Sequence, residues 1–244
     1  MMWHVYYNDM TMQKGKLVVI EGSDGAGKAT QLGLLVEYFK SHHVPCATLD
    51  FPQYYKTFFG KWIGRFLKGE FGTVKDISPW LLLFPYAADR WQAKGDVEHW
   101  LDEGKVVLSN RYTGSNAYQA AKVPKEDRTR FLDWSFEMEY DAFGIPKEDL
   151  VIFLYVPFAV SQKLLEQKAA RKYMGNAREK DIHESDTALL QEVEKVYLGL
   201  CERFPHWVKI DCTKNGVILS KEDIHRKILS VLRRKKIISD PNHQ

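Results

Sequence analysis

Short apolar segments alternate with segments of helical periodicity along most of the chain. Runs of apolar and β-branched residues, which are typical of buried strands, occupy residues 16–21, 47–51, 105–109, 149–156 and 207–211. Apolar residues at helical spacing occupy residues 32–39, 80–91, 128–140, 159–171, 189–204 and 224–232. This alternation predicts an α/β fold of three layers, with a central five-stranded parallel sheet and helices on both of its faces.

The segments follow one another without a repeat or a linker rich in Pro, Gly and Ser. We therefore expect an N-terminal extension at residues 1–15, a single domain at residues 16–238 and a tail at residues 239–244. Residues 171–186 differ from the rest because they are polar and highly charged, which predicts a mobile lid.

Composition narrows the possible partners. The chain has 244 residues, 45% of them hydrophobic, and 35 Lys and Arg against 32 Asp and Glu. A net charge of only +3 is too even to predict a nucleic-acid-binding surface, and no apolar run approaches the roughly 20 residues of a membrane helix. Cys46, Cys201 and Cys212 are widely spaced, as expected for thiols in a reducing compartment. We expect a cytoplasmic protein without nucleic-acid or membrane partners.

A glycine-rich loop follows the first predicted strand and precedes a predicted helix. Its sequence, GSDGAGKAT at residues 22–30, has the order and spacing of a P-loop. Gly22, Gly25 and Gly27 let backbone N–H groups face a phosphate, and Lys28 adds a full positive charge. A ligand-free turn is the alternative, but the flanking strand and helix favour ATP-phosphate binding by Gly22, Gly25, Ala26, Gly27, Lys28, Ala29 and Thr30.

One position departs from the P-loop pattern. Where a Ser or Thr hydroxyl usually reaches Mg²⁺, the chain has Ala29. Thr30 comes next, but one residue along a helix rotates the side chain by about 100°. We expect Mg²⁺, bound together with ATP, to be held mainly by phosphate oxygens and water.

From residue 16 to about residue 232 the sequence resembles the thymidylate kinase family. The matching segments occur in the family's order: EGSDGAGK at 21–28, FPQY at 51–54, LFPYAADR at 83–90, NRYTGSN at 110–116 and DIHE at 181–184. The resemblance implies a P-loop nucleoside monophosphate kinase that transfers the γ-phosphoryl group of ATP to dTMP, giving dTDP and ADP. It also implies a homodimer.

Two arginines are candidates for the acceptor phosphate. Arg111 follows a predicted central strand, at the sheet edge where open α/β folds bind ligands, and a guanidinium there can hold a phosphate bidentately. Arg90 lies near the end of a predicted amphipathic helix. A surface ion pair is the alternative for each. The resemblance assigns both to the monophosphate and the transferring group.

The resemblance also assigns residues to the nucleoside. Tyr86, on the same helical face as Arg90, would stack on thymine, and Ser115 and Asn116 match the segment that reads the base. This segment is one residue shorter than usual, which leaves open whether Tyr118 or Gln119 faces the base. The deoxyribose and phosphate side would be lined by Phe51, Pro52 and Tyr54.

Asp24 and Asn110 concern the charge balance of the site. A carboxylate beside phosphates is costly unless it meets a cation or a hydroxyl, and the resemblance gives Asp24 the acceptor's 3′ hydroxyl and the surroundings of the metal. A turn-capping role is the alternative for Asp24.

Asn110 stands where many relatives have Asp, so this position keeps a side-chain oxygen and loses the negative charge. We expect Mg²⁺ near Asp24, Thr30 and Asn110.

The lid is expected to supply a catalytic cation. Family members carry a catalytic arginine either in the phosphate loop or in the lid, and this loop has Gly25 and Ala26. Arg178 and then Arg171 are therefore the candidates, and Glu184 would either orient these arginines or approach the sugar. A solvated charged face is the alternative. The predicted catalytic set is Lys28, Arg111, Arg178, Arg171 and Asp24.

Two other functions remain open from the residues alone. One is a kinase for another nucleotide or nucleoside, because thymine, uracil and modified pyrimidines differ by groups worth about 1–3 kcal/mol. The other is a weakly catalytic regulatory protein that binds nucleotide, suggested by Ala29 and Asn110.

Overall fold

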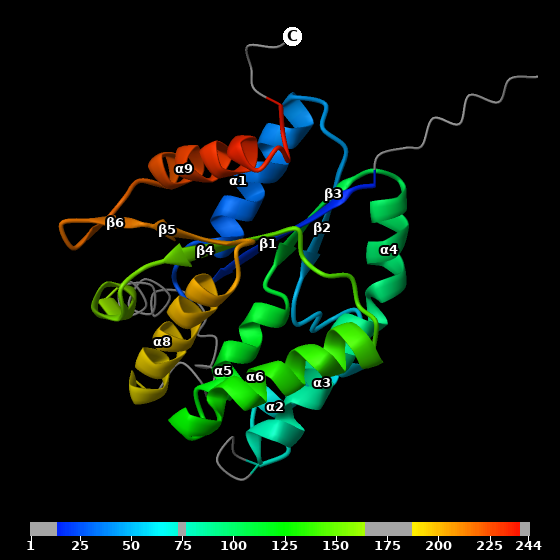
Figure 1. Ribbon diagram of the computed structural model, residues 1–244, viewed down its shortest axis with the longest axis vertical. Coiled ribbons are helices and arrows are strands. Elements are labelled where there is room, and N and C mark those ends of the chain that lie inside the picture. Colours follow the sequence, from blue (N-terminus) through cyan, green and yellow to red (C-terminus); the bar gives the residue numbers. More distant parts are fainter. Residues whose placement is uncertain (1–13, 73–76, 164–186, 240–244) are drawn as a thin grey trace, which may run out of the picture.

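Five parallel strands form the centre of the molecule (Figure 1). The computed structural model describes residues 14–72, 77–163 and 187–239. The strand order is β2-β3-β1-β4-β5. The bounds are β1 (Lys16–Gly22), β2 (Cys46–Asp50), β3 (Val106–Asn110), β4 (Leu150–Tyr155) and β5 (Trp207–Asp211). The predicted α/β fold with a five-stranded parallel sheet is confirmed.

Helices cover both faces of the sheet. On one face α1 (Lys28–Ser41) and α9 (Lys221–Arg234) pack side by side (Figure 1). The other face carries α3 (Pro79–Gln92), α4 (Lys94–Asp102), α5 (Ala117–Ala120), α6 (Arg128–Phe136) and α8 (Thr187–Arg203). Each layer encloses its own apolar core.

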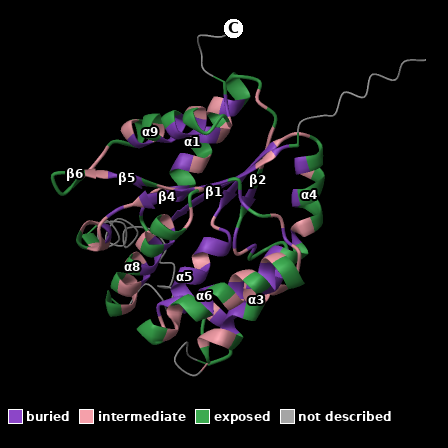
Figure 2. Cartoon of the chain, in the orientation of Figure 1, coloured by how far each residue is buried: buried purple, intermediate pink, exposed green. Residues whose placement is uncertain are grey.

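The burial of the strands explains why the sequence forms this sheet. All four side chains from Leu17 to Ile20 in β1 are fully buried, because β1 is the central strand and helices cover both its sides (Figure 2). The edge strand β5 instead mixes buried and exposed positions. A continuous apolar run therefore marks the centre of the sheet.

Several elements differ from the expectation. The helix expected at 128–140 divides into α6 and a π-helical segment, η4 (Glu137–Ala142). The sequence analysis missed α2 (Phe58–Leu67), which contains two glycines, and the polar α4. It also missed the hairpin of β6 (Thr213–Lys214) and β7 (Val217–Ile218). Of the helix expected at 159–171, residues 159–163 are helical and the remainder lies outside the described residues.

The carboxyl ends of β1, β2 and β3 meet at one edge of the sheet. Asn110, the last residue of β3, lies opposite Ile20 of β1 and Asp50 of β2. Between β3 and α5 the chain forms a 3₁₀ turn, η2 (Thr113–Asn116).

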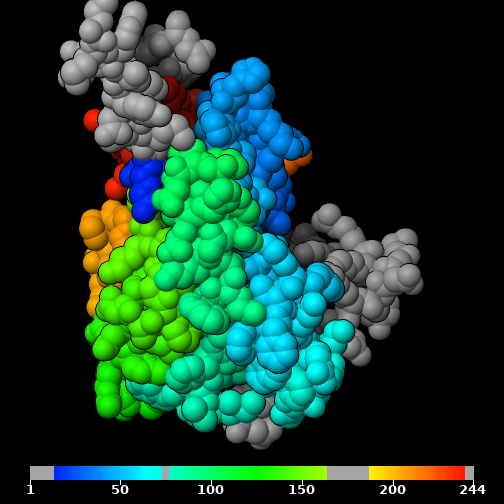
Figure 3. Space-filling model, turned by 90° about the vertical axis from the view of Figure 1, so that its right-hand side faces the viewer, coloured from blue at the N-terminus to red at the C-terminus, as the bar shows by residue number. Residues whose placement is uncertain are grey.

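From the side, α4 runs down the middle of one face with α2 beside it (Figure 3). Within the described parts of the chain, no helix has the length and apolarity needed to cross a membrane.

Candidate active site

The glycine-rich loop forms a tight cradle between β1 and α1. Gly22, Gly25 and Gly27 all have positive φ, at 157°, 82° and 88°. A β-carbon at Gly22 would lie 3.0 Å from the carbonyl oxygen of Leu154, so the loop also needs a small residue there. No side chain caps the first turn of α1, which leaves backbone N–H groups available to an anion. This backbone is suited to bind phosphate.

Lys28 folds over the cradle. Its Nζ donates hydrogen bonds to the carbonyl oxygens of Gly22 and Ser23, both at 3.0 Å, and lies 3.7 Å from Asp24 Oδ1. Burial and then repulsion by Arg111 lower the pKa of Lys28 to about 8, although nearby carboxylates act in the opposite direction. A phosphate bound in the cradle would favour the charged lysine.

Arg111 owes its position to an unusual backbone conformation. Its φ is +66°, in the left-handed region that favours glycine. Its own N–H donates to the carbonyl oxygen of Ile20, and the next N–H, of Tyr112, donates to Glu21 Oε1 at 2.8 Å. Glu21 is fully buried and also accepts hydrogen bonds from the Tyr197 hydroxyl and Ser115 Oγ. This carboxylate, missed in the sequence analysis, fixes the turn that carries Arg111.

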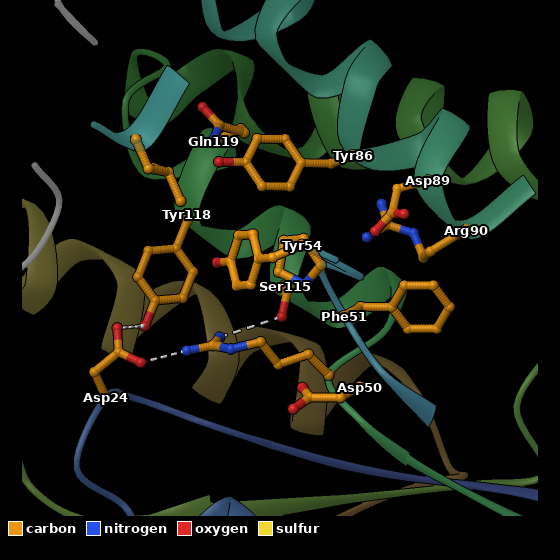
Figure 4. Close-up of a pocket in the computed structure, with 13 residues that line it drawn as sticks. Asp24, Asp50, Phe51, Tyr54, Tyr86, Asp89, Arg90, Ser115, Tyr118 and Gln119 are labelled. Atoms are coloured by element: carbon orange, nitrogen blue, oxygen red, sulfur yellow. Dashed lines mark hydrogen bonds and ion pairs between the residues drawn. The ribbon is translucent and has the colours of Figure 1, made fainter. Parts of the chain in front are cut away.

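The Arg111 guanidinium joins the end of β3 to the phosphate cradle. Its Nη2 donates to Asp24 Oδ1 at 2.5 Å, and its Nη1 donates to Ser115 Oγ at 3.3 Å. The Tyr118 hydroxyl donates to the other oxygen of Asp24 at 3.0 Å, and the Tyr118 ring packs against the guanidinium (Figure 4). Burial would raise the pKa of Asp24, but Arg111, Lys28 and Tyr118 together lower it to about 2. Asp24 is therefore ionised at neutral pH and only accepts hydrogen bonds.

A cavity of about 200 Å³ opens beside this cluster. Asp24, which binds Arg111, lies at one end of the cavity, and the Tyr86 ring and the Gln119 amide lie at the other end (Figure 4). The lining residues are Asp24, Asp50, Phe51, Pro52, Tyr54, Leu67, Tyr86, Asp89, Arg90, Arg111, Ser115, Tyr118 and Gln119. The structure thus brings together every residue expected to bind the acceptor except Asn116 and Glu184.

The two residues left open after Ser115 both lie on α5. Tyr118 reaches toward Asp24, whereas Gln119 lies beside Tyr86, so both side chains line the cavity from different ends (Figure 4). Burial and the charge of Asp24 raise the pKa of the Tyr118 phenol, which keeps its proton available for donation. Which of the two contacts a base stays a prediction.

Arg90 has a different environment from the one expected. It is 3% exposed and forms a buried ion pair with Glu139, which is fully buried in η4. Its Nε and Nη2 donate to the two Glu139 oxygens at 2.5 and 2.7 Å, and its Nη2 also donates to Asn116 Oδ1. It lines the cavity as part of a fixed wall, and the surface ion pair considered as its alternative is excluded.

The expectation of direct contact between Asn116 and the acceptor requires correction. Asn116 is 1% exposed and does not line the cavity. Its Oδ1 accepts from Arg90, and its Nδ2 donates to Glu139 Oε1 at 2.7 Å, so both amide atoms are engaged inside the wall. Asn116 supports Arg90 from behind the cavity.

The loop after β2 is tied to α3 by Asp89. Its Oδ2 accepts from the Gln53 N–H at 2.8 Å, and its Oδ1 accepts from Thr57 Oγ1. Phe51 packs on the Tyr112 ring, with centroids 5.6 Å apart, and precedes a cis peptide bond to Pro52. This network, which sequence reasoning missed, holds Phe51, Pro52 and Tyr54 at the cavity.

The predicted metal region contains a carboxylate that was not anticipated. Asp50 lies at the end of β2, and its Oδ1 accepts a hydrogen bond from Asn110 Nδ2 at 2.8 Å. Burial raises the pKa of Asp50, and Asn110, Arg111 and Lys28 offset part of that effect. Ala29 and Thr30 are exposed in the first turn of α1. Arg171, Arg178 and Glu184, with the rest of the expected lid, lie outside the described residues.

A phosphate cradle at the end of β1, beside a cavity with a second cation at the end of β3, defines a P-loop kinase for a small phosphorylated acceptor. The thymidylate kinase family model matches residues 20–228. The chain therefore belongs to the thymidylate kinase family, which comprises nucleotide-binding phosphotransferases that use ATP.

Curated relatives and a solved structure agree with this assignment. The thymidylate kinase of Mycobacterium tuberculosis is 32% identical over 75% of this chain and 85% of its own length. That of Plasmodium falciparum is 28% identical over 92% of this chain and 93% of its own length. The thymidylate kinase structure from Candida albicans shares the fold, with a TM-score of 0.71 at 21% identity, covering 93% of this chain and 96% of that one.

Proposed function

We propose that this protein transfers the γ-phosphoryl group of ATP to the 5′ phosphate of dTMP, giving dTDP and ADP. The observation that carries the proposal is the link from Arg111 to Asp24, which joins the cavity to the cradle through one 2.5 Å contact. A donor phosphate in the cradle and an acceptor phosphate at Arg111 would then lie on opposite sides of one cationic cluster. The family membership supports the same reaction.

The reaction requires positioning and charge neutralisation more than proton transfer. The acceptor phosphate is already an anionic nucleophile, so no general base is needed. In this proposal Lys28 and the N-terminus of α1 bind the donor phosphates, and Arg111 holds the acceptor phosphate. Asp24 offsets the repulsion between Arg111 and Lys28 and orients both, because its carboxylate lies within reach of each.

The base end of the cavity suits a planar nucleobase. Tyr86 offers an aromatic face, Gln119 offers an amide donor and acceptor, and Phe51 closes the side next to the sugar. Arg90 is fixed by Glu139 and so presents a defined edge of the wall. A planar base with both a donor and an acceptor on its edge is the ligand that these groups recognise.

Magnesium is the expected cofactor, and the residues at the sheet edge fit it. Asp50 provides a carboxylate, and Asn110 provides a buried amide oxygen that lacks a donor among the described residues. Bound Mg²⁺ would neutralise charge on the phosphates that are being transferred. The lid arginines Arg178 and Arg171 remain predicted to add positive charge at the same stage.

The test is ADP release by the purified full chain with a panel of deoxynucleoside monophosphates and nucleosides, each with Mg²⁺ or Mn²⁺. We expect turnover with dTMP to exceed that with purine monophosphates by at least a hundredfold. Lys28→Ala, which removes the cradle's charge, is the matched inactive control. Nucleotide binding without ADP release under every condition would instead favour the regulatory alternative.

We also propose that the protein is a cytoplasmic homodimer. The α3 side chains Leu81, Phe84 and Trp91 are 64%, 45% and 50% exposed, which is high for large apolar groups. Phe84 also packs against Trp134 of α6, so the apolar surface extends over two helices. Light scattering should give twice the mass of one chain, and Phe84→Glu should shift the measured mass toward that of one chain.

The three free thiols support a reducing compartment.

A further inference from the structure

The carboxyl ends of β2 and β3 present a paired acid and amide. Asp50 and Asn110 are the last residues of their strands and lie opposite each other in the parallel register. Asn110 Nδ2 donates to Asp50 Oδ1 at 2.8 Å. An ionised carboxylate only accepts hydrogen bonds, so this contact fixes which end of the Asn110 amide faces Asp50.

The remaining amide atom is unsatisfied. Asn110 is 8% exposed, and its Oδ1 is buried without a donor among the residues that the structure describes. A buried acceptor without a hydrogen-bond donor costs folding free energy, so buried amide oxygens usually accept a hydrogen bond or contact a cation. The orientation imposed by Asp50 therefore leaves an oxygen ready for a ligand that donates.

The neighbouring residues indicate what kind of ligand this is. Asp50 lines the acceptor cavity and is close enough to Lys28 and Arg111 for their charges to act on it. Asp50 is thus at the cavity wall and within electrostatic range of both cations. Mg²⁺ usually retains several waters, which donate hydrogen bonds, and it prefers carboxylate oxygens to neutral ligands.

We propose that Asp50, from β2, carries the negative charge of the magnesium site, and that Asn110 Oδ1 accepts a hydrogen bond from the metal's water shell. Position 110 holds a neutral amide, and the carboxylate of the pair lies on β2 instead. This inference rests on the proposed function only in taking the donor to be a metal-bound nucleoside triphosphate. It explains how a site with Ala29 and Asn110 retains a charged metal partner.

The experiment measures metal binding rather than turnover. Mn²⁺ is titrated into the full chain with a non-hydrolysable ATP analogue, and free Mn²⁺ is followed by electron paramagnetic resonance. The variants are Asp50→Asn, the exchange Asp50→Asn with Asn110→Asp, and Asp102→Asn as a matched control. Asp102 is an exposed carboxylate at the end of α4, which precedes the amino end of β3. All variants are also assayed for nucleotide binding in EDTA.

Asp50→Asn should weaken Mn²⁺ binding at least tenfold and leave metal-free nucleotide binding within twofold. The exchange variant should recover most of the affinity, because it returns one carboxylate to the pair while preserving an amide-to-carboxylate hydrogen bond. If Asp50→Asn and the control Asp102→Asn change Mn²⁺ affinity to the same small extent, Asp50 does not hold the metal and the proposal is overturned. Failure of Mn²⁺ to bind the wild-type complex also overturns it.

The parallel ADP-release assay with dTMP separates this inference from the proposed function. If Mn²⁺ affinity changes in the variants as expected but the wild type transfers no phosphate to dTMP, the metal site is supported and dTMP is rejected as the acceptor. Transfer to dTMP with no effect of Asp50→Asn on Mn²⁺ affinity would keep the kinase and reject the metal assignment.

Discussion

The two arginines of the cavity, which the sequence analysis treated alike, occupy opposite physical environments. Arg111 is 15% exposed at its side chain and shares a partly exposed carboxylate, that of Asp24, with Lys28 and Tyr118. Arg90 is 3% exposed and faces Glu139, which has no exposure at all. One arginine keeps donors for a ligand, and the other is neutralised inside the protein.

The difference in environment predicts that Arg111 binds a ligand and that Arg90 stabilises the cavity wall. Four donor contacts of Arg90 go to Glu139, Asn116 and the Tyr112 carbonyl oxygen. A guanidinium has five N–H donors, so little capacity is left for an acceptor phosphate. Among the described residues, the Arg111 guanidinium donates to Asp24 and at longer range to Ser115, and the Tyr118 ring packs against it. Acceptor chemistry should therefore depend on Arg111, and stability on Arg90.

Replacement of Arg111 should give the largest effect. Arg111→Ala is expected to lower kcat/KM for dTMP by about 10³-fold or more, because an arginine on transferring phosphate charge is worth about 10³–10⁵. Steady-state kinetics at saturating ATP measure this. Arg111→Lys keeps the charge without the fork and should fall between Ala and wild type. An unchanged kcat/KM for dTMP in Arg111→Ala would show that Arg111 does not bind the acceptor.

Replacement of Arg90 should instead lower the free energy of unfolding. Arg90→Met leaves Glu139 buried without its partner, which typically costs about 3–5 kcal/mol of unfolding free energy. Urea unfolding followed by tryptophan fluorescence gives the value. The double variant Arg90→Met with Glu139→Met should recover much of the loss, because neither charge remains. A loss below about 1 kcal/mol in the single variant would argue against a wall-building role.

Lys28 provides a pH test of the donor side. Its pKa of about 8 in the free protein should rise when phosphate binds, because the charged lysine is the form that phosphate favours. ATP affinity should thus be constant below about pH 8 and fall up to tenfold per unit above it. Calorimetric titration from pH 7 to pH 9.5 measures the profile.

Two variants check the origin of that profile. Lys28→Arg, which stays charged throughout, should bind ATP independently of pH in this range. Asp24→Asn removes a carboxylate that raises the pKa of Lys28, so the decline should begin at a lower pH. A wild-type profile that is flat to pH 9.5 would contradict the assignment of Lys28.

Tyr118→Phe should have the smallest effect. The change removes one hydrogen bond to Asp24 and keeps the ring against Arg111. We expect KM for dTMP to rise about three- to tenfold, as for one hydrogen bond of about 0.5–1.5 kcal/mol, with kcat changed less than twofold. A large loss of kcat would show that the phenol acts on the transferring group.

The sequence predicted those parts of the fold and the site that are encoded locally. The strands appeared within about one residue of their predicted ends because buried parallel strands are continuous apolar runs, and the cradle was evident from its glycines and Lys28. Glu139, Asp89 and Asp50 escaped notice because each acquires its role from a partner far along the chain, as Glu139 does from Arg90, 49 positions away. Glu21 gave a weak signal as an acid ending an apolar strand.

The left-handed backbone of Arg111 also has a consequence for protein engineering. At φ +66° a residue with a β-carbon is strained, and glycine or asparagine adopts this conformation more cheaply. A library at this position, sorted once by melting temperature and once by turnover, should rank glycine and arginine in opposite orders. Selection for heat resistance alone would therefore tend to remove the acceptor site.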